Sequence, residues 1–554
     1  MKFQNILVFF LSFISFCLSA QNMEDYTSGW EGQIENTKTF NLSVEIADFF
    51  SDNPVFTISN NRIIFEQSFK KTENKLVRIK VGKNLSFEGR LSEKNNKING
   101  FIKSGLLFYH LNLTKTNTGS FTGVWNILMV DELKSQKFYL SLENGSGDKY
   151  QAYPILGDNR FTGTWCGNFK KENDTISFSD IKTGLNFLGK LLDQKIQLSV
   201  YLESYLVTQI ALSPSHTDWQ IGNFGTNKKD KINQSIQLNE LENLIAKDSL
   251  PNTHSILISK KGKIIYENYF AGYNNRIPHD MRSASKSISS AIVGIAKDRF
   301  LLESLDQSIF DFLPQKYQIY KDSLKYKIDI KSLLTMSSGL DALDFGAEGV
   351  SKASEGNYQN SEDWTKTIIT APMINEPNEH ANYGSANPHL LGVAMDSVIP
   401  EQLEDFIDKN LFEKLEISNY IIQADNIGSP YFGGGMYLTP NDMMKFGQLY
   451  LNRGKWENEK VLSEEWVANS FKNYRNLENT NDKNGYGFLW WHHGYQVNGK
   501  SIKTIEARGS GGQYIFVIPE LETVVVITSG NFRNGKFQQP ELILEKYILP
   551  KIYS

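Results

Sequence analysis

The chain has 554 residues, an apolar fraction of 40% and a formal net charge of -4, from 58 basic and 62 acidic side chains. A chain of this length is too long to fold around a single hydrophobic core, so two or three domains are expected. Its basic and acidic residues are interleaved and provide no positive stripe for a phosphate backbone. We therefore do not expect nucleic acid as a partner.

The first 20 residues have the pattern of a secretory signal peptide. Lys2 precedes an apolar run over 6–18, and Ala20 provides a small residue before a polar one, which is the order found in a cleavable leader. The run is shorter than the ~20 apolar residues of a membrane-spanning helix, and no later segment reaches that length. We expect an exported protein, periplasmic or extracellular, without a membrane span.

Cysteine usage adds little to this picture. Cys17 would leave with the leader, and its lipidation is disfavoured because bulky Phe16 stands where a lipobox has a small residue. Cys166 then has no intramolecular partner, so export does not imply a disulfide framework. Its strand-like surroundings favour a buried, inert thiol.

From 21 to 222 the sequence predicts antiparallel β structure that occurs twice. Short β-branched and aromatic runs alternate with clusters of Asn, Gly, Asp and Lys. The segment Leu85-Ser-Phe-Glu-Gly-Arg-Leu91 returns as Leu185-Asn-Phe-Leu-Gly-Lys-Leu191, and Trp30 and Trp125 precede the two copies. We predict two repeated modules. Core packing is the interpretation we favour for their aromatic residues, and contact with a cell wall or glycan is a further candidate role of the repeats.

The polar stretch 223–235 predicts a linker, after which the pattern changes. Apolar residues at helical spacing predict a helix, followed by strands at 255–259 and 264–269. Helices and strands alternate until strands at 513–518 and 523–528 and a final amphipathic helix. We predict an α/β region over 236–554, with strands from both of its ends in one sheet, that folds separately from the repeats.

Ser283-Ala-Ser-Lys286 opens a predicted helix whose apolar face continues through Ile288, Ala291 and Ile295. Residues three apart share one face of a helix, so we expect the Ser283 hydroxyl and the Lys286 amine within hydrogen-bonding reach. A lysine can activate a serine when burial or a neighbouring cation lowers the lysine pKa. The free N–H groups of a helix start also favour an oxyanion. This spacing predicts a nucleophilic serine with a lysine base.

Other patterns carry less weight. Ser-x-x-Lys also occurs at Ser68–Lys71 and Ser179–Lys182, but in strand or turn contexts where no helix joins the pair. The chain has no Gly-x-Ser-x-Gly or His-Glu-x-x-His pattern. The adjacent His492 and His493 would point to opposite faces of a strand, which makes them a poor metal chelate. We expect no metal and no cofactor.

The segment Met281-Arg-Ser-Ala-Ser-Lys-Ser-Ile-Ser-Ser-Ala-Ile-Val-Gly-Ile-Ala296 resembles the nucleophile helix of class C β-lactamases, family VIII carboxylesterases and 6-aminohexanoate-dimer hydrolases. Further segments that resemble this family follow in its order, at 330–340, 433–443, 446–450 and 486–491. The resemblance implies a β-lactamase and penicillin-binding-protein fold, an antiparallel sheet flanked by helices, behind the all-β repeat region. It also implies an acyl-enzyme at Ser283 with Lys286 as its base.

The family's second motif, Tyr-x-Asn or Tyr-x-Ser, implies a tyrosine that relays protons between nucleophile, lysine and leaving group. We choose Tyr383-Gly-Ser385, because the following Ala-Asn-Pro-His-Leu-Leu-Gly resembles the family at this point. Ser385 then becomes a candidate for substrate binding. Tyr358 is the alternative, and Tyr273 and Tyr474 also begin such a motif.

The family's third motif, Lys-Thr-Gly or His-x-Gly, is expected at Ser510-Gly511-Gly512. The chain departs from the family here, because a serine stands where relatives carry histidine or lysine. The glycines allow close approach of a substrate, and the N–H groups of Gln513 and Ser283 are expected to form the oxyanion hole. Arg508 is a candidate to replace the missing cation, with a solvated arginine as the alternative.

Together these features predict an exported serine hydrolase that cleaves a small-molecule ester, amide or peptide. A charge-assisted hydrogen bond contributes about 1.5–3 kcal/mol, so a serine at position 510 should weaken recognition of substrates with a carboxylate. We therefore expect an esterase or amidase. The alternatives are a D-Ala-D-Ala peptidase or β-lactamase, and a non-catalytic binding protein with a relic hydrolase domain.

Overall fold

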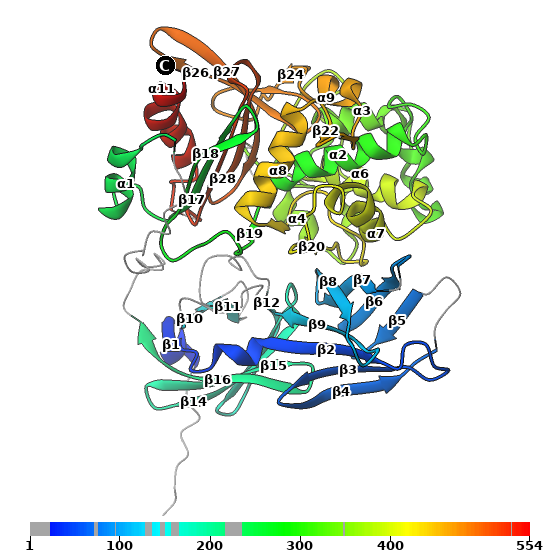
Figure 1. The fold of residues 1–554 in the computed structure, drawn as a ribbon, viewed down its shortest axis with the longest axis vertical. Helices are drawn as coiled ribbons and strands as arrows, with labels where there is room; N and C mark the ends of the chain where they lie inside the picture. The colour runs from blue at the N-terminus through cyan, green and yellow to red at the C-terminus, as the bar shows by residue number, and fades with distance from the viewer. Residues whose placement is uncertain are drawn as a thin grey trace, which may run out of the picture.

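The structure is a computed structural model that describes residues 23–70, 76–94, 96–127, 136–144, 150–156, 166–215, 235–346, 350–532 and 534–553. The predicted leader at 1–20 and nearly all of the predicted linker at 223–235 lie outside these residues. Within the described ranges, no helix is both long and apolar enough to cross a membrane. An all-strand region lies beside an α/β region, which is drawn above it in Figure 1.

An 8-stranded antiparallel sheet forms the middle of the α/β region. Its strands lie in the order β18 (Lys263–Tyr269), β17 (Thr253–Lys260), β29 (Thr523–Ser529), β28 (Gln513–Ile518), β27 (Lys500–Gly509), β26 (Trp491–Val497), β25 (Gly485–Tyr486) and β24 (Arg475–Asn476). Because β17 pairs with β29, Ile256 lies opposite Ile527. Strands from both ends of the region thus meet in one sheet, as the sequence predicted.

Helices cover both faces of this sheet (Figure 1). One face carries α2 (Ser285–Asp298) and α8 (Pro440–Leu451), and the other carries α1 (Asn239–Ala246), α10 (Gln539–Ile543) and α11 (Leu549–Ile552). Alternate residues of a strand point to opposite faces. Accordingly Ile515 and Val517 join the core around α2, whereas Tyr514 and Phe516 join the core around the terminal helices. The predicted antiparallel sheet flanked by helices is confirmed.

Further helices complete the side of the sheet that holds α2. They are α3 (Ile330–Leu334), α4 (Glu355–Gln359), α5 (Trp364–Ile369), α6 (Ala386–Val398), α7 (Leu403–Ile407) and α9 (Glu464–Ser470). A small hairpin of β22 (Lys455–Trp456) and β23 (Glu459–Lys460) follows α8. Helix α6 packs against both α2 and α3, which brings the loop before α6 close to the start of α2.

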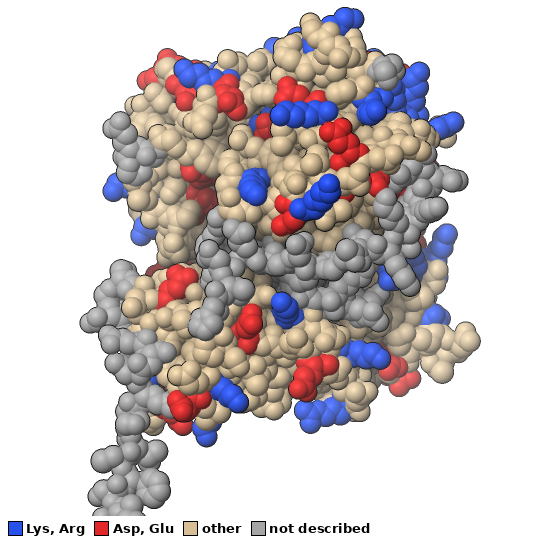
Figure 2. Space-filling model, turned by 90° about the vertical axis from the view of Figure 1, so that its left-hand side faces the viewer, with Lys and Arg blue, Asp and Glu red and all other residues tan. Residues whose placement is uncertain are grey.

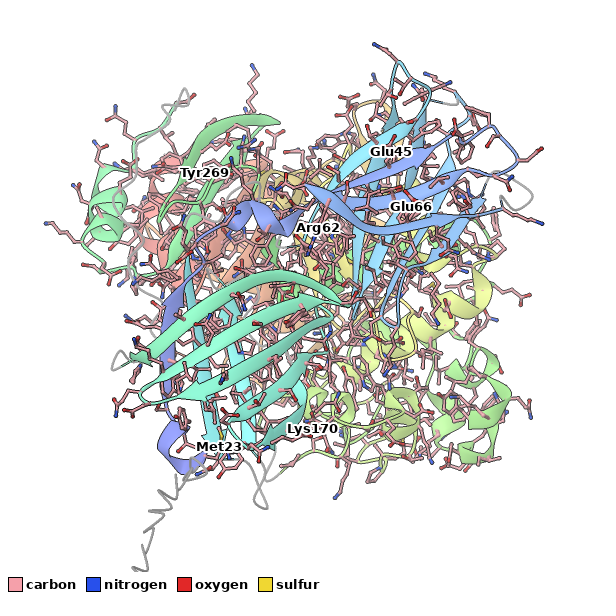
Figure 3. All side chains as sticks on the ribbon, turned by 90° about the horizontal axis from the view of Figure 1, so that it is seen from below. Met23, Glu45, Arg62, Glu66, Lys170 and Tyr269 are labelled. Atoms are coloured by element: carbon pink, nitrogen blue, oxygen red, sulfur yellow. The ribbon has the colours of Figure 1, made fainter. Side chains whose placement is uncertain are left out.

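The all-strand region forms two antiparallel sheets, seen side by side from below in Figure 3, where Glu45 and Glu66 label one and Lys170 the other. The first module contributes β2 (Asn41–Ala47), β3 (Val55–Asn60), β4 (Arg62–Ser68), β5 (Leu76–Lys80), β6 (Leu85–Leu91), β7 (Lys97–Ser104), β8 (Leu107–Lys115) and β9 (Phe121–Asn126). The second sheet has the order β11 (Tyr150–Leu156), β10 (Lys137–Asn144), β1 (Gly29–Gln33), β16 (Tyr205–Ser215), β15 (Lys195–Leu202), β14 (Leu185–Leu192), β13 (Thr175–Asp180) and β12 (Cys166–Glu172). Cys166 is only half-buried, and burial raises the pKa of its thiol.

The strand that holds Trp30 does not join the copy that it precedes. Strand β1 pairs with β10 and β16 of the second module. Strand β9, which holds Trp125 and precedes the second copy, pairs with β2 and β8 of the first. Strand β1 therefore lies between β10 and β16, the first and last strands of the second module. Strand β9 likewise lies between β2 and β8 of the first module. Side-chain alternation gives the face of a strand but not its neighbours, so this exchange was not predicted.

The two regions share one sheet, which the expectation of separate folding did not include. Strand β20 (Ile421–Gln423) pairs with β8, β21 (Met436–Leu438) pairs with β20, and β19 (His279–Asp280) pairs with β21. The sheet of the first module therefore has 11 strands and continues to the strand just before Ser283. Contacts between the repeats and the α/β region are thus more extensive than the sequence suggested, while separate folding of the repeats and the boundary at 223–235 stay predictions.

Charged side chains also join the two regions. Lys103 Nζ lies 2.5 Å from Glu404 Oε1, and an Arg90 nitrogen lies 3.8 Å from Asp405 Oδ2, so both pairs link the first module to α7. On the face shown in Figure 2, acidic and basic residues are interspersed over both regions. Among the described residues of that face, no broad area of one sign is visible.

Candidate active site

Ser283 lies in a single turn of 3-10 helix, Arg282–Ala284, that leads directly into α2. Arg282 has a left-handed φ of 51°, a backbone conformation that costs a residue with a side chain about 1–3 kcal/mol unless its surroundings impose it. Asp280 supplies part of that constraint, because its Oδ1 accepts the Arg282 N–H at 3.0 Å. The half-buried Ser283 side chain therefore projects from a strained and fixed turn.

Neighbouring strands hold this turn from two sides. A Cβ atom on Gly509 would lie 2.1 Å from the Met281 carbonyl oxygen, so the end of β27 passes directly against the turn. The Ser285 hydroxyl donates to the Arg282 carbonyl at 2.8 Å and accepts the Met436 N–H at 3.1 Å. Only glycine permits the approach at position 509, and a side chain there would displace the serine.

Lys286 lies beside Ser283 as the helical spacing predicted. Its Nζ donates to Ser283 Oγ at 2.9 Å and to the Gly433 carbonyl at 2.5 Å. Lys286 is 1% exposed. Burial lowers the pKa of Lys286, while the nearby carboxylates of Glu355 and Asp344 act in the opposite direction. A buried lysine with a lowered pKa releases its proton more readily than one in water.

Tyr383 completes this arrangement from the loop before α6. Its ring lies 5.1 Å from Lys286 Nζ and 5.0 Å from the Trp491 ring, measured to ring centroids. Burial raises the pKa of Tyr383 well above its ordinary value, and the nearby Ser283 side chain only partly opposes this shift. Tyr383 is therefore a neutral phenol at neutral pH, able to donate its proton.

Tyr358, the alternative for the second motif, has other partners. Its hydroxyl hydrogen-bonds to the hydroxyl of Tyr431, which donates to Glu355 Oε1 at 2.7 Å. The structure thus places Tyr383, and not Tyr358, beside Ser283. Tyr358 belongs to a buried polar cluster beneath the site.

Ser385 does not face a substrate. It is 0% exposed, and its N–H and hydroxyl both donate to Asp344 Oδ2, at 2.8 and 2.7 Å. Asp344 Oδ1 accepts the Glu355 N–H at 2.8 Å. Ser385 therefore fixes the loop that carries Tyr383, which corrects its candidate role in substrate binding.

Sequence analysis did not single out Asp344 or Glu355. Both carboxylates act on the pKa of Lys286, and burial in turn raises the pKa of Glu355 while the Lys286 charge lowers it. Neither residue lies in a motif or at a helical spacing from Ser283, so no local signal marks them. Only the fold places them beside the lysine.

Ser510-Gly511-Gly512 forms the turn between β27 and β28. Gly511 and Gly512 have left-handed φ angles of 81° and 87°, which favour glycine, whereas Ser510 is exposed. A Cβ atom on Gly511 would lie 2.3 Å from the Phe532 ring. The glycines are thus required by the turn itself. Gln513 begins β28 and is buried, and its side-chain amide donates to the Ser529 carbonyl. The role of its backbone N–H as a donor to the oxyanion stays a prediction.

Arg508 is buried and paired rather than solvated, and its role as a substrate anchor stays a prediction. It is 9% exposed, and its guanidinium lies 2.6 Å from Glu506 and 3.4 Å from Glu541. The cation also lies over the Trp491 ring, 5.1 Å from the centroid. A guanidinium held by two carboxylates is less available to a substrate carboxylate. Its partner Glu541 comes from α10 near the end of the chain, a contact that the sequence did not reveal.

Known proteins resemble the α/β region. The sequence pattern of the family described as Beta-lactamase matches residues 252–546. A 6-aminohexanoate-dimer hydrolase of Paenarthrobacter ureafaciens is 21% identical over 293 residues, which cover 50% of this chain and 71% of that protein. The octameric penicillin-binding protein homologue from Pyrococcus abyssi has a TM-score of 0.44 and 20% identity, over 57% of this chain and 80% of that one. EstCE1, a hydrolase with promiscuous acyltransferase activity, has a TM-score of 0.45 and 17% identity, over 56% of this chain and 97% of that one.

Proposed function

The chain belongs to the beta-lactamase family, and from this premise we propose that it is a serine hydrolase that cleaves an ester or amide through an acyl-enzyme at Ser283. One observation carries the proposal. Ser283 Oγ accepts a hydrogen bond from Lys286 Nζ at 2.9 Å, and the buried ring of Tyr383 lies 5.1 Å from the same Nζ. A nucleophile within hydrogen-bonding reach of a base, with a third polar group beside them, is the arrangement that activates a serine.

In the proposed reaction, neutral Lys286 takes the Ser283 proton as Oγ forms a bond to the carbonyl carbon. The N–H groups of Ser283 and Gln513 stabilise the resulting oxyanion. When the tetrahedral intermediate collapses, the bond to the leaving group breaks and that group takes the Tyr383 proton. Lys286 then returns its proton to Tyr383, and water releases the acyl group by the same steps in reverse.

A fluorophosphonate probe separates this proposal from the alternative of a binding protein with a relic hydrolase domain. The proposal expects the folded chain to be labelled stoichiometrically at Ser283, as located by mass spectrometry of the labelled peptide. A relic site would leave the chain unlabelled, since phosphonylation requires an activated serine.

The two candidate tyrosines are distinguished by single substitutions. Tyr383→Phe is expected to lower kcat for p-nitrophenyl butyrate by about 10²–10⁴, the usual contribution of a general acid or base. Tyr358→Phe should stay within about tenfold of wild type, because its hydroxyl contacts Tyr431 rather than Ser283. Steady-state kinetics of the two purified variants give the answer, and a greater loss in Tyr358→Phe would show that the second motif is misplaced.

We also propose that uncharged short-chain esters and simple amides are preferred to β-lactams and D-Ala-D-Ala peptides. Those two classes carry a carboxylate. Position 510 offers it a neutral hydroxyl, and the nearby Arg508 is already paired with Glu506 and Glu541. A lost charge-assisted contact of about 1.5–3 kcal/mol corresponds to a ten- to hundred-fold weaker interaction.

The comparison of kcat/KM for p-nitrophenyl butyrate and nitrocefin tests this preference. The wild type is expected to favour the ester, and Ser510→Lys should raise kcat/KM for nitrocefin by about tenfold or more while leaving the ester nearly unchanged. Position 510 is exposed, so the lysine fits. Efficient nitrocefin hydrolysis by the wild type would contradict the proposal.

We further propose that the chain is exported to the periplasm or beyond the cell. The support is the leader pattern of the first 20 residues. Contact of the β modules with a cell wall or glycan is part of the same proposal.

A further inference from the structure

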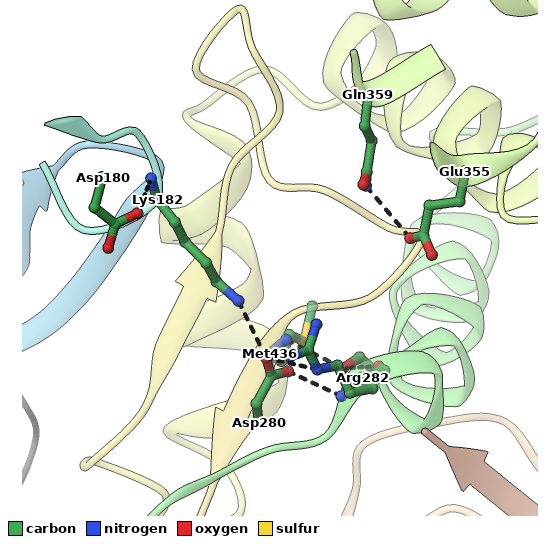
Figure 4. A network of polar contacts seen from close by, with 8 residues as sticks. Asp180, Lys182, Asp280, Arg282, Glu355, Gln359 and Met436 are labelled. Atoms are coloured by element: carbon green, nitrogen blue, oxygen red, sulfur yellow. Dashed lines mark hydrogen bonds and ion pairs between the residues drawn. The ribbon is translucent and has the colours of Figure 1, made fainter. Parts of the chain in front are cut away.

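The second module extends a lysine into the α/β region, to the strand that leads to Ser283. Lys182 lies in the turn between β13 and β14, and its side chain runs to Asp280 at the end of β19 (Figure 4). Lys182 Nζ donates to Asp280 Oδ2 at 3.1 Å, and the two side chains are only 2% and 1% exposed. This contact is therefore an ion pair inside the protein and not a surface pair, whose contribution would be small.

The turn that presents Lys182 is itself fixed by both modules. Asp180 Oδ1 accepts the Lys182 N–H at 2.9 Å, and the Thr183 hydroxyl donates to Asp180 Oδ2 at 2.6 Å. From the first module, the Leu106 N–H donates to the Lys182 carbonyl at 2.9 Å. Gly105 lies so close that a Cβ atom there would be 2.7 Å from the same carbonyl oxygen. The lysine thus extends from a rigid support.

Asp280 connects this lysine to the nucleophile turn. Its Oδ1 accepts the Arg282 N–H at 3.0 Å, and its Oδ2 lies 3.1 Å from Arg282 Nε as well as from Lys182 Nζ. Burial raises the pKa of Asp280, but the charges of Arg282 and Lys182 outweigh it and hold that pKa below its ordinary value. The carboxylate is therefore ionised, and it is held by Arg282 and Lys182 from different parts of the chain. Burial lowers the pKa of Lys182, and the charge of Asp280 opposes this shift.

We propose that Lys182 is a positioning residue for the reaction at Ser283: it orients the Asp280 carboxylate, which holds the left-handed backbone of Arg282 and thereby the serine beside it. The inference rests on the proposed acyl-enzyme function. It makes the repeat region part of the active-site scaffold. Without the lysine, Arg282 is the cation that remains beside Asp280 among the described residues, and the carboxylate turns toward it, so the constraint on the turn weakens.

Lys182→Met tests this role, because the methionine side chain is unbranched like that of lysine but carries no charge. The expected result is a 10- to 100-fold fall in kcat for p-nitrophenyl butyrate with KM within about twofold, since a misplaced nucleophile slows the bond-forming step rather than binding. The rate constant for fluorophosphonate labelling of Ser283 should fall by a similar factor, because it depends on the same oxygen.

Lys103→Met is the matched control. Lys103 belongs to the first module and forms an ion pair with Glu404, which is 3% exposed, across the same boundary. That pair contacts α7 rather than the nucleophile turn. Lys103→Met is expected to lower the melting temperature about as much as Lys182→Met does, while its kcat and labelling rate stay within about twofold of wild type.

The outcomes separate this inference from the proposed function. A wild type that is not labelled would overturn the function and the inference with it. A labelled wild type whose rate is matched by folded Lys182→Met would overturn the inference alone. If Lys182→Met does not fold, the double variant that combines Lys182→Met with Asp280→Asn is measured instead, because it removes one charge of each sign. A double variant that is labelled slowly but melts at the wild-type temperature supports the inference. A double variant that is labelled at the wild-type rate overturns it.

Discussion

Ser283→Ala is expected to abolish hydrolysis of p-nitrophenyl butyrate in a protein that remains folded. Removal of a catalytic nucleophile lowers kcat on the order of 10⁶. The fold should tolerate the change, because Ser283 is only half-buried and Lys286 keeps its bond to the Gly433 carbonyl at 2.5 Å. Steady-state kinetics and thermal unfolding of purified Ser283→Ala measure the two effects independently.

Ser287→Ala is the matched control for this prediction. Ser287 lies one turn further along α2, and its hydroxyl donates to the Leu489 carbonyl at 2.7 Å instead of facing Ser283. Its loss should lower stability by about 1–3 kcal/mol, since it leaves a buried carbonyl without a partner, and should leave kcat within a few-fold of wild type. Turnover by pure Ser283→Ala at more than about a thousandth of the wild-type rate would assign the reaction to another residue.

The Ser-x-x-Lys patterns at Ser68–Lys71 and Ser179–Lys182 do not supply such a residue among the described positions. Ser179 lies in β13, where its hydroxyl donates to Asn186 at 2.7 Å, and Lys182 turns away to Asp280. Ser68 ends β4, and Lys71 lies outside the described residues. Spacing alone is therefore a weak signal, and the helix is what joins Ser283 to Lys286.

The features that the sequence predicted are those that local pattern determines. A helix brings residues three apart together, so Ser283 and Lys286 follow from spacing once the helix is predicted. Apolar runs such as 513–518 and 523–528 predict strands, and the structure has β28 and β29 there. Tyr383 followed from the resemblance of the segment around it, which no spacing rule would have selected from four candidates.

The features that the sequence missed all depend on contacts between distant segments. The pairing of β8 with β20, the ion pair of Arg508 with Glu541 and the contact of Lys182 with Asp280 each join residues with no shared periodicity. Local patterns set which face of an element is apolar but not which element covers it. For that reason the repeat region was predicted as a separate unit, when it extends the sheet that ends beside the nucleophile.

Lys286→Arg is expected to be nearly inactive although it keeps the positive charge. In the proposed reaction Lys286 must be neutral to accept the Ser283 proton, and a guanidinium stays protonated at any relevant pH. The expected loss in kcat is about 10²–10⁴, the usual contribution of a positioned base. Lys286→Met removes the base without adding a buried cation, so it should be equally slow and more stable to heat than Lys286→Arg.

The pH dependence of the wild type gives an independent check on this base. Burial lowers the pKa of Lys286 from its ordinary 10.5, so acylation should fall as the pH falls through the lowered value, and should already be at its plateau below 10.5. Stability should change with pH in the same direction as the rate. Between the lowered pKa of Lys286 in the folded chain and its ordinary pKa in the unfolded chain, only the unfolded chain binds the proton, so the free energy of unfolding rises with pH. Both Lys286 variants should lack this limb of the rate profile. An arginine variant that acylates at the wild-type rate, with the wild-type pH profile, would show that another group removes the Ser283 proton.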